Sequence, residues 1–334
     1  RPSSGPLIVA LALLLPATIQ AQTEPPTEIP PGLFDALEYR HVGPLGNRVI
    51  AVTGVVGERN VYFVGAASGG IFKTTDGGAH WRPVFDDMPA ASIGALAVAP
   101  SDPNVVWAGT GETFLRANVS IGNGVYRSTD GGETWEHRGL EATGRIGRVI
   151  VHPTDPDVVY AAALGHCYGP PEERGVYRTE DSGETWQQVL FAGENAGASD
   201  LVMDPTNPRI LFAGTWEIRL DPWSRRSGGP GSGLWASRDG GDTWKRLEGK
   251  GLPEPPWGKI GLTMSAADPE RVYALIETSS NRDFAPVEAF QGVRWRSDDG
   301  GETWEMTSAD NNLVQRPLYY SRALAAPDDA ERVY

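Results

Sequence analysis

The sequence has a single cysteine, a shortage of basic residues and no apolar run long enough to cross a bilayer. Cys167 alone cannot form an internal disulfide or a multi-cysteine metal site, so the fold must be stable through burial. With 29 Lys and Arg against 43 Asp and Glu, the formal charge of −14 argues against a nucleic-acid partner, which would require clustered cations. The longest apolar run, residues 7–15, is too short for a transmembrane segment.

Common catalytic motifs are missing too. The sequence has no G-x-S-x-G elbow, no H-E-x-x-H zinc motif and no phosphate-binding loop, and its five histidines lack ligand spacing. We therefore predict no metal and no cofactor. The glycine-rich segment Ser227–Gly233 lacks the strand-then-helix setting of a nucleotide loop, and its composition indicates a flexible tip.

The first residues have the pattern of an export signal. The apolar run 7–15 follows Arg1 and precedes Ile19-Gln20-Ala21, a small-residue cleavage site, which predicts a signal peptide over residues 1–21. Residues 22–33, with four prolines, are typical of an extended linker. We therefore expect an exported protein, periplasmic or extracellular, whose start lies upstream because no initiating Met is present.

One eight-residue pattern, close to Ser-x-Asp-x-Gly-x-Thr-Trp, occurs five times. Its aspartates are 54, 51, 58 and 60 residues apart, a period typical of propellers and solenoids. Each copy, or Asp box, predicts a hairpin in which the carboxylate accepts loop N–H groups and the tryptophan covers the turn. The structural residues are Asp76, Asp130, Asp181, Asp239 and Asp299, with Trp81, Trp135, Trp186, Trp244 and Trp304.

Two further apolar strands precede each box, so that every repeat contains four strands. Four-stranded antiparallel units of this length predict an all-β β-propeller, with a β-solenoid as the less favoured alternative. Within residues 34–334 we predict five blades and the start of a sixth, at about 46–85, 92–137, 144–190, 198–247, 259–307 and 319–334. Because an open arc would expose two apolar faces, we expect the natural chain to continue beyond Tyr334.

The connections between second and third strands vary most in length, and we expect them to gather on one face, away from the Asp boxes. Their aromatic and charged side chains suit a sugar or peptide ligand, although they could equally pack the loops onto the blades. The candidate ligand-binding residues are Phe114, Arg116, Tyr168, Trp216, Arg219, Trp223 and Arg225.

Glu112, Asp200 and Glu217 are the candidate catalytic carboxylates, since strand ends place them near the predicted central channel. A glycosidase needs two of them across one bond. The alternative is structural: Glu112 and Glu217 could cap strand ends or pair with Arg145, Arg148 or Arg219.

The boxes at Ser128, Ser237 and Ser297 match the Asp-box, or bacterial neuraminidase repeat, in full. With Tyr39–Pro44, Gly65–Thr75, Gly109–Glu112 and Gly228–Gly233, the chain resembles exported bacterial sortilin-like or BNR-repeat glycosyl hydrolases. Sialidases of this repeat class use an Arg-Ile-Pro arginine, but Arg145-Ile146 and Arg209-Ile210 here lack the proline. No xyloglucanase aspartate matches a motif of this sequence.

The sequence therefore predicts an exported Asp-box propeller that recognises a polysaccharide or a peptide on its loop-rich face. Two alternatives stay open: a xyloglucanase-like glycoside hydrolase with a two-carboxylate mechanism, and a periplasmic assembly scaffold that binds a protein partner.

Overall fold

The computed structural model describes residues 48–116, 119–168, 173–278, 291–314 and 316–334. By its internal contacts the chain divides into residues 1–41 and 42–334, and every described residue belongs to the second unit. The predicted signal peptide and linker lie outside the described residues.

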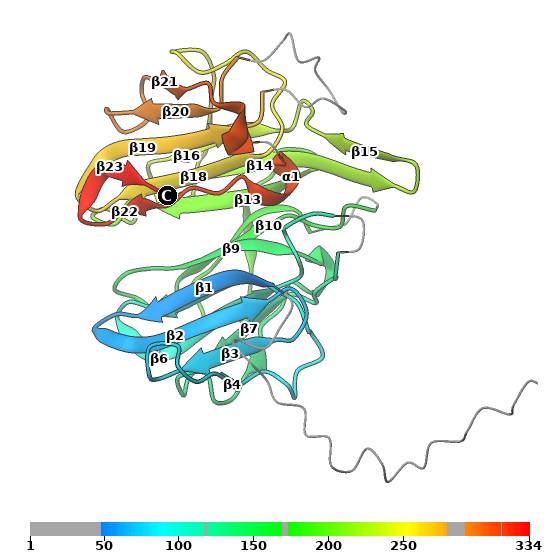
Figure 1. Cartoon of the computed structure of the whole chain (residues 1–334), viewed down its shortest axis with the longest axis vertical. Helices are drawn as coiled ribbons and strands as arrows, with labels where there is room; N and C mark the ends of the chain where they lie inside the picture. Colours follow the sequence, from blue (N-terminus) through cyan, green and yellow to red (C-terminus); the bar gives the residue numbers. More distant parts are fainter. Residues whose placement is uncertain (1–47, 117–118, 169–172, 279–290, 315) are drawn as a thin grey trace, which may run out of the picture. The chain divides into compact units, whose positions relative to one another are not determined.

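Antiparallel sheets of four strands follow one another along the chain (Figure 1). The first two contain β1 (Val49–Val55), β2 (Glu58–Ala66), β3 (Ile71–Thr74) and β4 (Arg82–Pro83), then β5 (Ile93–Ala99), β6 (Asp102–Thr110), β7 (Val125–Ser128) and β8 (Glu136–His137). The third contains β9 (Ile146–Val151), β10 (Val159–Ala163), β11 (Gly175–Thr179) and β12 (Gln187–Leu190).

The fourth sheet contains β13 (Ala196–Met203), β14 (Leu211–Asp221), β16 (Gly233–Ser237) and β17 (Lys245–Leu247), with β15 (Ser224–Ser227) paired to the far end of β14. The fifth contains β18 (Ile260–Ser265), β19 (Asp268–Ile276), β20 (Arg294–Ser297) and β21 (Glu305–Ser308). A helix, α1 (Pro317–Tyr320), precedes the pair β22 (Ala325–Ala326) and β23 (Asp329–Val333). The first strand of each sheet contacts the first strand of the next, so the predicted all-β propeller is confirmed.

Adjacent blades pack closely where one isoleucine lies against two glycines. A methyl group on Gly109, in β6, would lie 2.4 Å from the Ile146 side chain of the next inner strand. The neighbouring Gly94, in β5, faces the Ile146 carbonyl oxygen, which such a methyl would approach to 2.3 Å. Only glycine allows backbones this close, and Ile146 is fully buried as a result.

The Asp boxes form the hydrogen bonds expected from their sequence. Oδ1 of Asp130 accepts the backbone N–H groups of Glu133 and Thr134 at 2.9 Å and the hydroxyl of Ser128 at 2.8 Å. Oδ2 accepts the Thr134 hydroxyl at 2.6 Å. These bonds close the turn within seven residues, so the box is a local folding device.

The boxes also join neighbouring blades, which the sequence did not reveal. The glycine at the fifth position of a box lies against an aromatic ring from the second strand of the preceding blade, so that an added methyl would meet the ring at 2.6 to 3.3 Å. The pairs are Gly132 with Phe63, Gly183 with Trp107, Gly241 with Tyr160 and Gly301 with Phe212. A polar link accompanies the fourth box, where the Tyr160 hydroxyl donates to the Gly240 carbonyl at 2.7 Å.

Candidate functional site

The described parts of the long connections lie on the face opposite the boxes, as predicted, and are bonded to one another and to neighbouring segments. The Arg145 guanidinium donates to the Glu112 carbonyl at 3.1 Å, and the Leu220 N–H donates to the Cys167 carbonyl at 2.7 Å. The Leu115 N–H donates to the Leu318 carbonyl at 3.2 Å. We call this surface the loop-rich face.

Glu112 is buried beneath this face and paired. Its carboxylate lies 3.0 Å from both the Arg48 and the Arg116 guanidinium groups, and its side chain has no exposed surface. A charge removed from water requires such partners. Arg145, which the sequence offered as a partner, binds the Glu112 main-chain oxygen instead. With no surface to offer a substrate, Glu112 has the geometry of a structural residue.

Asp200 fastens neighbouring inner strands. One oxygen accepts the Arg148 guanidinium at 2.8 Å, and the other accepts the N–H of Leu262, on β18, at 3.0 Å. Asp200 is only 3% exposed. This carboxylate is therefore committed to the junction between the fourth and fifth sheets.

Glu217 is the candidate carboxylate that reaches a pocket. Its Oε1 accepts the Gly231 N–H at 2.6 Å, and its own N–H donates to the Ser232 hydroxyl at 2.9 Å. Ser227 and Ser232 are fully buried. The prediction of a flexible tip at Ser227–Gly233 is wrong, because Glu217 and the buried serines hold this segment in place.

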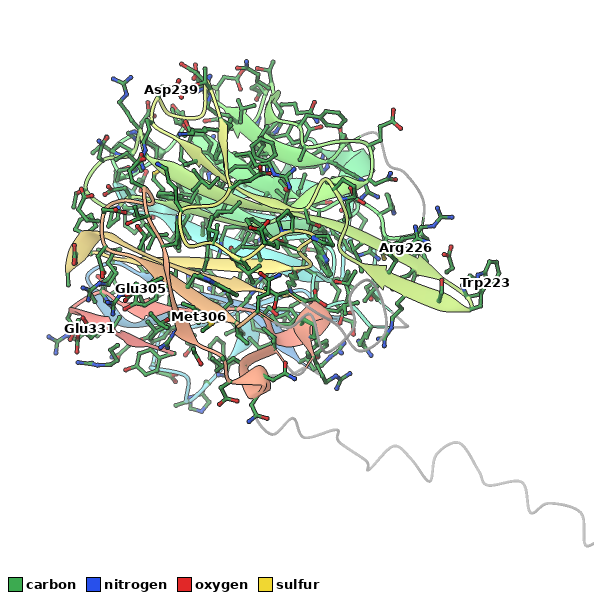
Figure 2. All side chains as sticks on the ribbon, turned by 90° about the horizontal axis from the view of Figure 1, so that it is seen from above. Trp223, Arg226, Asp239, Glu305, Met306 and Glu331 are labelled. Carbon is green, nitrogen blue, oxygen red and sulfur yellow. The ribbon has the colours of Figure 1, made fainter. Side chains whose placement is uncertain are left out.

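A projecting hairpin replaces the expected loop after Glu217. Strand β14 continues to Asp221 and pairs with β15, with Trp223 at the turn (Figure 2). Ile218 and Leu220 are buried on one side, while Arg219 is 67% exposed on the other. This alternation of apolar and polar residues, followed by Asp-Pro, was the sequence signal for the hairpin.

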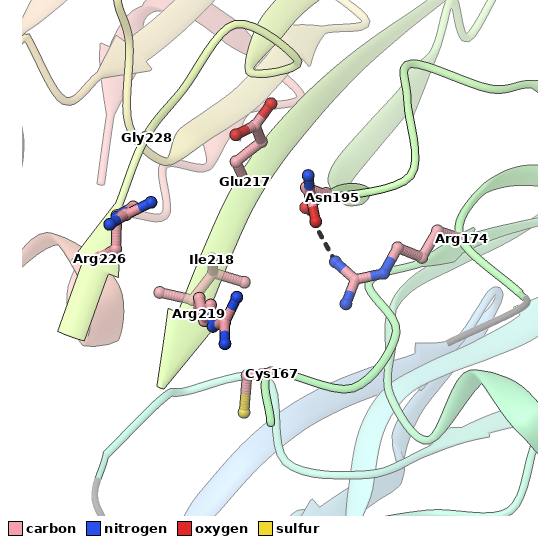
Figure 3. A pocket seen from close by; sticks show the side chains of 8 residues that line it. All are labelled: Cys167, Arg174, Asn195, Glu217, Ile218, Arg219, Arg226 and Gly228. Atoms are coloured by element: carbon pink, nitrogen blue, oxygen red, sulfur yellow. Dashed lines mark hydrogen bonds between the residues drawn. The ribbon is translucent and has the colours of Figure 1, made fainter. Parts of the chain in front are cut away.

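The pocket lies between this hairpin and the connections that contain Cys167, Arg174 and Asn195 (Figure 3). It has a volume of about 100 Å³, and three arginines contribute to its wall: Arg174, Arg219 and Arg226. Of the predicted residues, Glu217 and Arg219 line it. Reasoning from sequence missed Arg174, and it placed Arg225 in the site instead of the next residue along, Arg226.

The other predicted ligand-binding residues lie elsewhere. Trp216 is fully buried, with its indole N–H donating to the Ser227 hydroxyl at 3.0 Å, so its assignment to a ligand surface is wrong. Arg116 is engaged by Glu112. Tyr168 is 52% exposed and lies beneath the Arg145 guanidinium. Trp223 is 84% exposed.

Phe114 belongs to a cationic cluster that α1 covers. The Lys259 ammonium lies 5.6 Å from the Phe114 ring centre and the Arg322 guanidinium 4.9 Å from it. Burial, followed by the nearby Arg322 charge, lowers the pKa of Lys259 to about 7. Helix α1 contacts the cluster through the Leu318 carbonyl, which accepts from Lys259 at 3.4 Å, and through the Tyr319 ring on Phe114.

The described residues contain no cluster of three or more His, Cys, Asp or Glu able to hold a metal ion. They likewise contain no helix long and apolar enough to span a bilayer. Cys167 is a buried free thiol.

Comparison with known proteins relates the chain to two groups. It is 28% identical to xyloglucanase Xgh74A of Acetivibrio thermocellus over 229 residues, which cover 61% of this chain and 25% of that protein. It is 25% identical to the photosystem II assembly lipoprotein Ycf48 of Synechococcus sp. over 213 residues, covering 55% of this chain and 57% of that protein. The chain thus spans about a quarter of the xyloglucanase.

Family models and solved structures agree on the fold. The model described as "Sortilin, neurotensin receptor 3" matches residues 123–252, and the BNR/Asp-box repeat model matches residues 295–306. The crystal structure of the Niastella koreensis GH74 enzyme has a TM-score of 0.61 at 18% identity, covering 85% of this chain and 43% of that chain. By its repeats, its sheets and these matches, the chain is a BNR/Asp-box repeat β-propeller that resembles the BNR-repeat glycosyl hydrolases.

Proposed function

We propose that this chain is part of an exported protein that binds a polysaccharide on its loop-rich face without cleaving it. The observation that carries the proposal is that the candidate catalytic carboxylates are already engaged. Glu112 and Asp200 are buried against arginines, and Glu217 holds the segment around Gly231. Among the described residues the three carboxylates share no hydrogen-bond partner.

The exposed part of the loop-rich face suits the binding of a sugar. The pocket beside Glu217 opens on the loop-rich face, and the hairpin that forms one wall presents Trp223 to solvent. An exposed indole offers a flat apolar face, and guanidinium groups offer several directed hydrogen-bond donors. Together they match the apolar faces and the hydroxyl-bearing edges of a sugar ring. The similarity to xyloglucanase Xgh74A supports a polysaccharide over other polymers.

The experiment is a direct comparison of binding and turnover. The full chain would be titrated calorimetrically with soluble plant and microbial polysaccharides while reducing-end release is measured on the same samples. We expect saturable binding, weakened by Trp223→Ala, with no release of reducing ends. Release that Glu217→Gln abolishes would overturn the proposal and establish a hydrolase.

Glycoside hydrolysis is the second candidate, since Glu217 lines a pocket. Hydrolysis with two carboxylates requires a second one at about 5 Å or at roughly 6.5–9.5 Å. Glu217 is the only carboxylate among the described residues that line this pocket. The geometry therefore favours binding.

A scaffold that binds a protein partner is the third candidate, and it is supported by the similarity to Ycf48. It predicts that no polysaccharide binds in the calorimetric titration. That result would overturn the polysaccharide proposal and favour the scaffold.

A further inference from the structure

Two arginines face each other across the projecting hairpin. In the register of β14 and β15, Arg219 lies directly opposite Arg226, and both line the pocket. Like charges directly opposite on one face destabilise a strand pair. Within the described residues the Arg226 side chain has no hydrogen-bond or ion-pair partner, and the Arg219 side chain pairs only with Asp221, an exposed contact at 3.2 Å.

A third arginine approaches from the neighbouring blade. Arg174, just before β11, donates to the backbone carbonyls of Asn195, at 2.9 Å, and His166. It is 3% exposed, and these carbonyls fix its position. Burial lowers its pKa to about 10, which leaves it charged at neutral pH. The pocket therefore contains a preorganised cation in addition to the two on the hairpin.

The size and charge of the pocket define its ligand. With Glu217 in the wall and Asp221 paired to Arg219, the three arginines leave a net charge of +1, which suits a small anion. The volume of about 100 Å³ corresponds to roughly three water molecules. A carboxylate group, with three heavy atoms and two oxygens that accept from guanidinium forks, fits this space.

We propose that this pocket binds the carboxylate of a uronic acid within an acidic polysaccharide, with a neighbouring sugar ring on Trp223. Trp223 precedes Arg226 by three residues, about 10 Å along an extended strand, so one oligosaccharide can reach both. The chain's net charge of −14 repels polyanions, so the attraction must come from this local cluster. This inference rests on the proposed polysaccharide binding and specifies its ligand class.

The test is calorimetric titration of the full chain with tetragalacturonate, its methyl ester, a neutral xyloglucan oligosaccharide and a poly-glutamate peptide. We expect tetragalacturonate to bind most tightly and its methyl ester to bind much more weakly. Arg226→Ala should weaken tetragalacturonate binding about 10- to 100-fold, the loss expected for charged hydrogen bonds. Arg226→Lys should retain part of the affinity, because the charge stays and the fork is lost.

Arg209→Ala is the matched control. Arg209 is an exposed arginine of the same blade, at the opposite end of β14, with no side-chain partner among the described residues. We expect this variant to bind like the parent protein. Equal losses in Arg209→Ala and Arg226→Ala would overturn the pocket as the binding site.

The ligand panel separates two kinds of failure. Equal binding of xyloglucan and tetragalacturonate would overturn the carboxylate inference and leave polysaccharide binding intact. Absence of binding to every glycan would overturn the proposed function itself. Binding of poly-glutamate alone, lost in Arg226→Ala, would overturn the uronic acid assignment in favour of an acidic peptide.

Discussion

Replacing Glu112 by glutamine tests whether this residue has a structural or a catalytic role. Glutamine keeps the shape of the side chain but removes the charge that faces Arg48 and Arg116, each at 3.0 Å. Glu112 is fully buried, whereas the two arginine side chains are 26% and 31% exposed. The substitution thus leaves two partly buried cations without their counter-ion.

Breaking a buried ion pair by removing one partner costs about 3–5 kcal/mol. Because water reaches both arginines, we expect the lower end, about 3 kcal/mol of unfolding free energy. At roughly 2–4 °C per kcal/mol, Tm should fall by about 6–12 °C. Calorimetry and urea unfolding measure both quantities, with Glu58→Gln, an exposed glutamate on β2, as the control. A double-mutant cycle with Arg116→Met should give a coupling energy of about 0.5–3 kcal/mol.

The functional consequence follows from the same geometry. Below the Tm of both proteins, Glu112→Gln should bind polysaccharide as the parent does. An unchanged Tm would refute the structural account of Glu112. Loss of glycan turnover with unchanged stability would restore its catalytic assignment.

Three further predictions concern the boxes and the cationic cluster around Phe114. Gly132→Ala should lower the free energy of unfolding by about 2–5 kcal/mol, because φ of Gly132 is +86° and the methyl would lie 2.6 Å from Phe63. Gly57→Ala is the control in urea unfolding, since Gly57 has a φ of +85° but open space around it, so this variant measures the backbone contribution alone. Hydrogen bonds from Thr243 lower the pKa of Asp239 to about 2. The stability that this box contributes is therefore present above pH 4 and is lost as the pH falls towards 2. Asp239→Asn should flatten a plot of Tm against pH between pH 4 and pH 2. Lys259, with a folded pKa of about 7 against about 10.4 unfolded, binds fewer protons when folded between these values, so stability should rise with pH in that window. Lys259→Met should remove that slope in urea unfolding at pH 6, 8 and 9.5.

The sequence predicted the propeller because its signals are local. Strand alternation and the Asp-box hydrogen bonds, such as that between Asp130 and Thr134, act within a few residues. The hairpin of β14 and β15 is equally local, but the sequence analysis missed it because it predicts a loop between the second and third strands of this blade. The apolar side of that hairpin, Ile218 and Leu220, was its available signal.

The partners of the charged residues could not be predicted. Glu112 pairs with Arg48, 64 positions earlier, in place of the arginines considered from sequence. Arg226 lines the pocket in place of Arg225, because the register with β14 sets which of two adjacent arginines faces Arg219.

The repeat, the turn chemistry and the all-β architecture therefore follow from the sequence alone, since these depend on hydrogen bonds and side-chain alternation within one hairpin. The folded structure was needed to show which carboxylates are buried, which rings are exposed and which three arginines line one pocket. Those outcomes depend on strand register and on the packing of one blade against the next, and they join residues, such as Arg174 and Arg226, that have no local reason to interact.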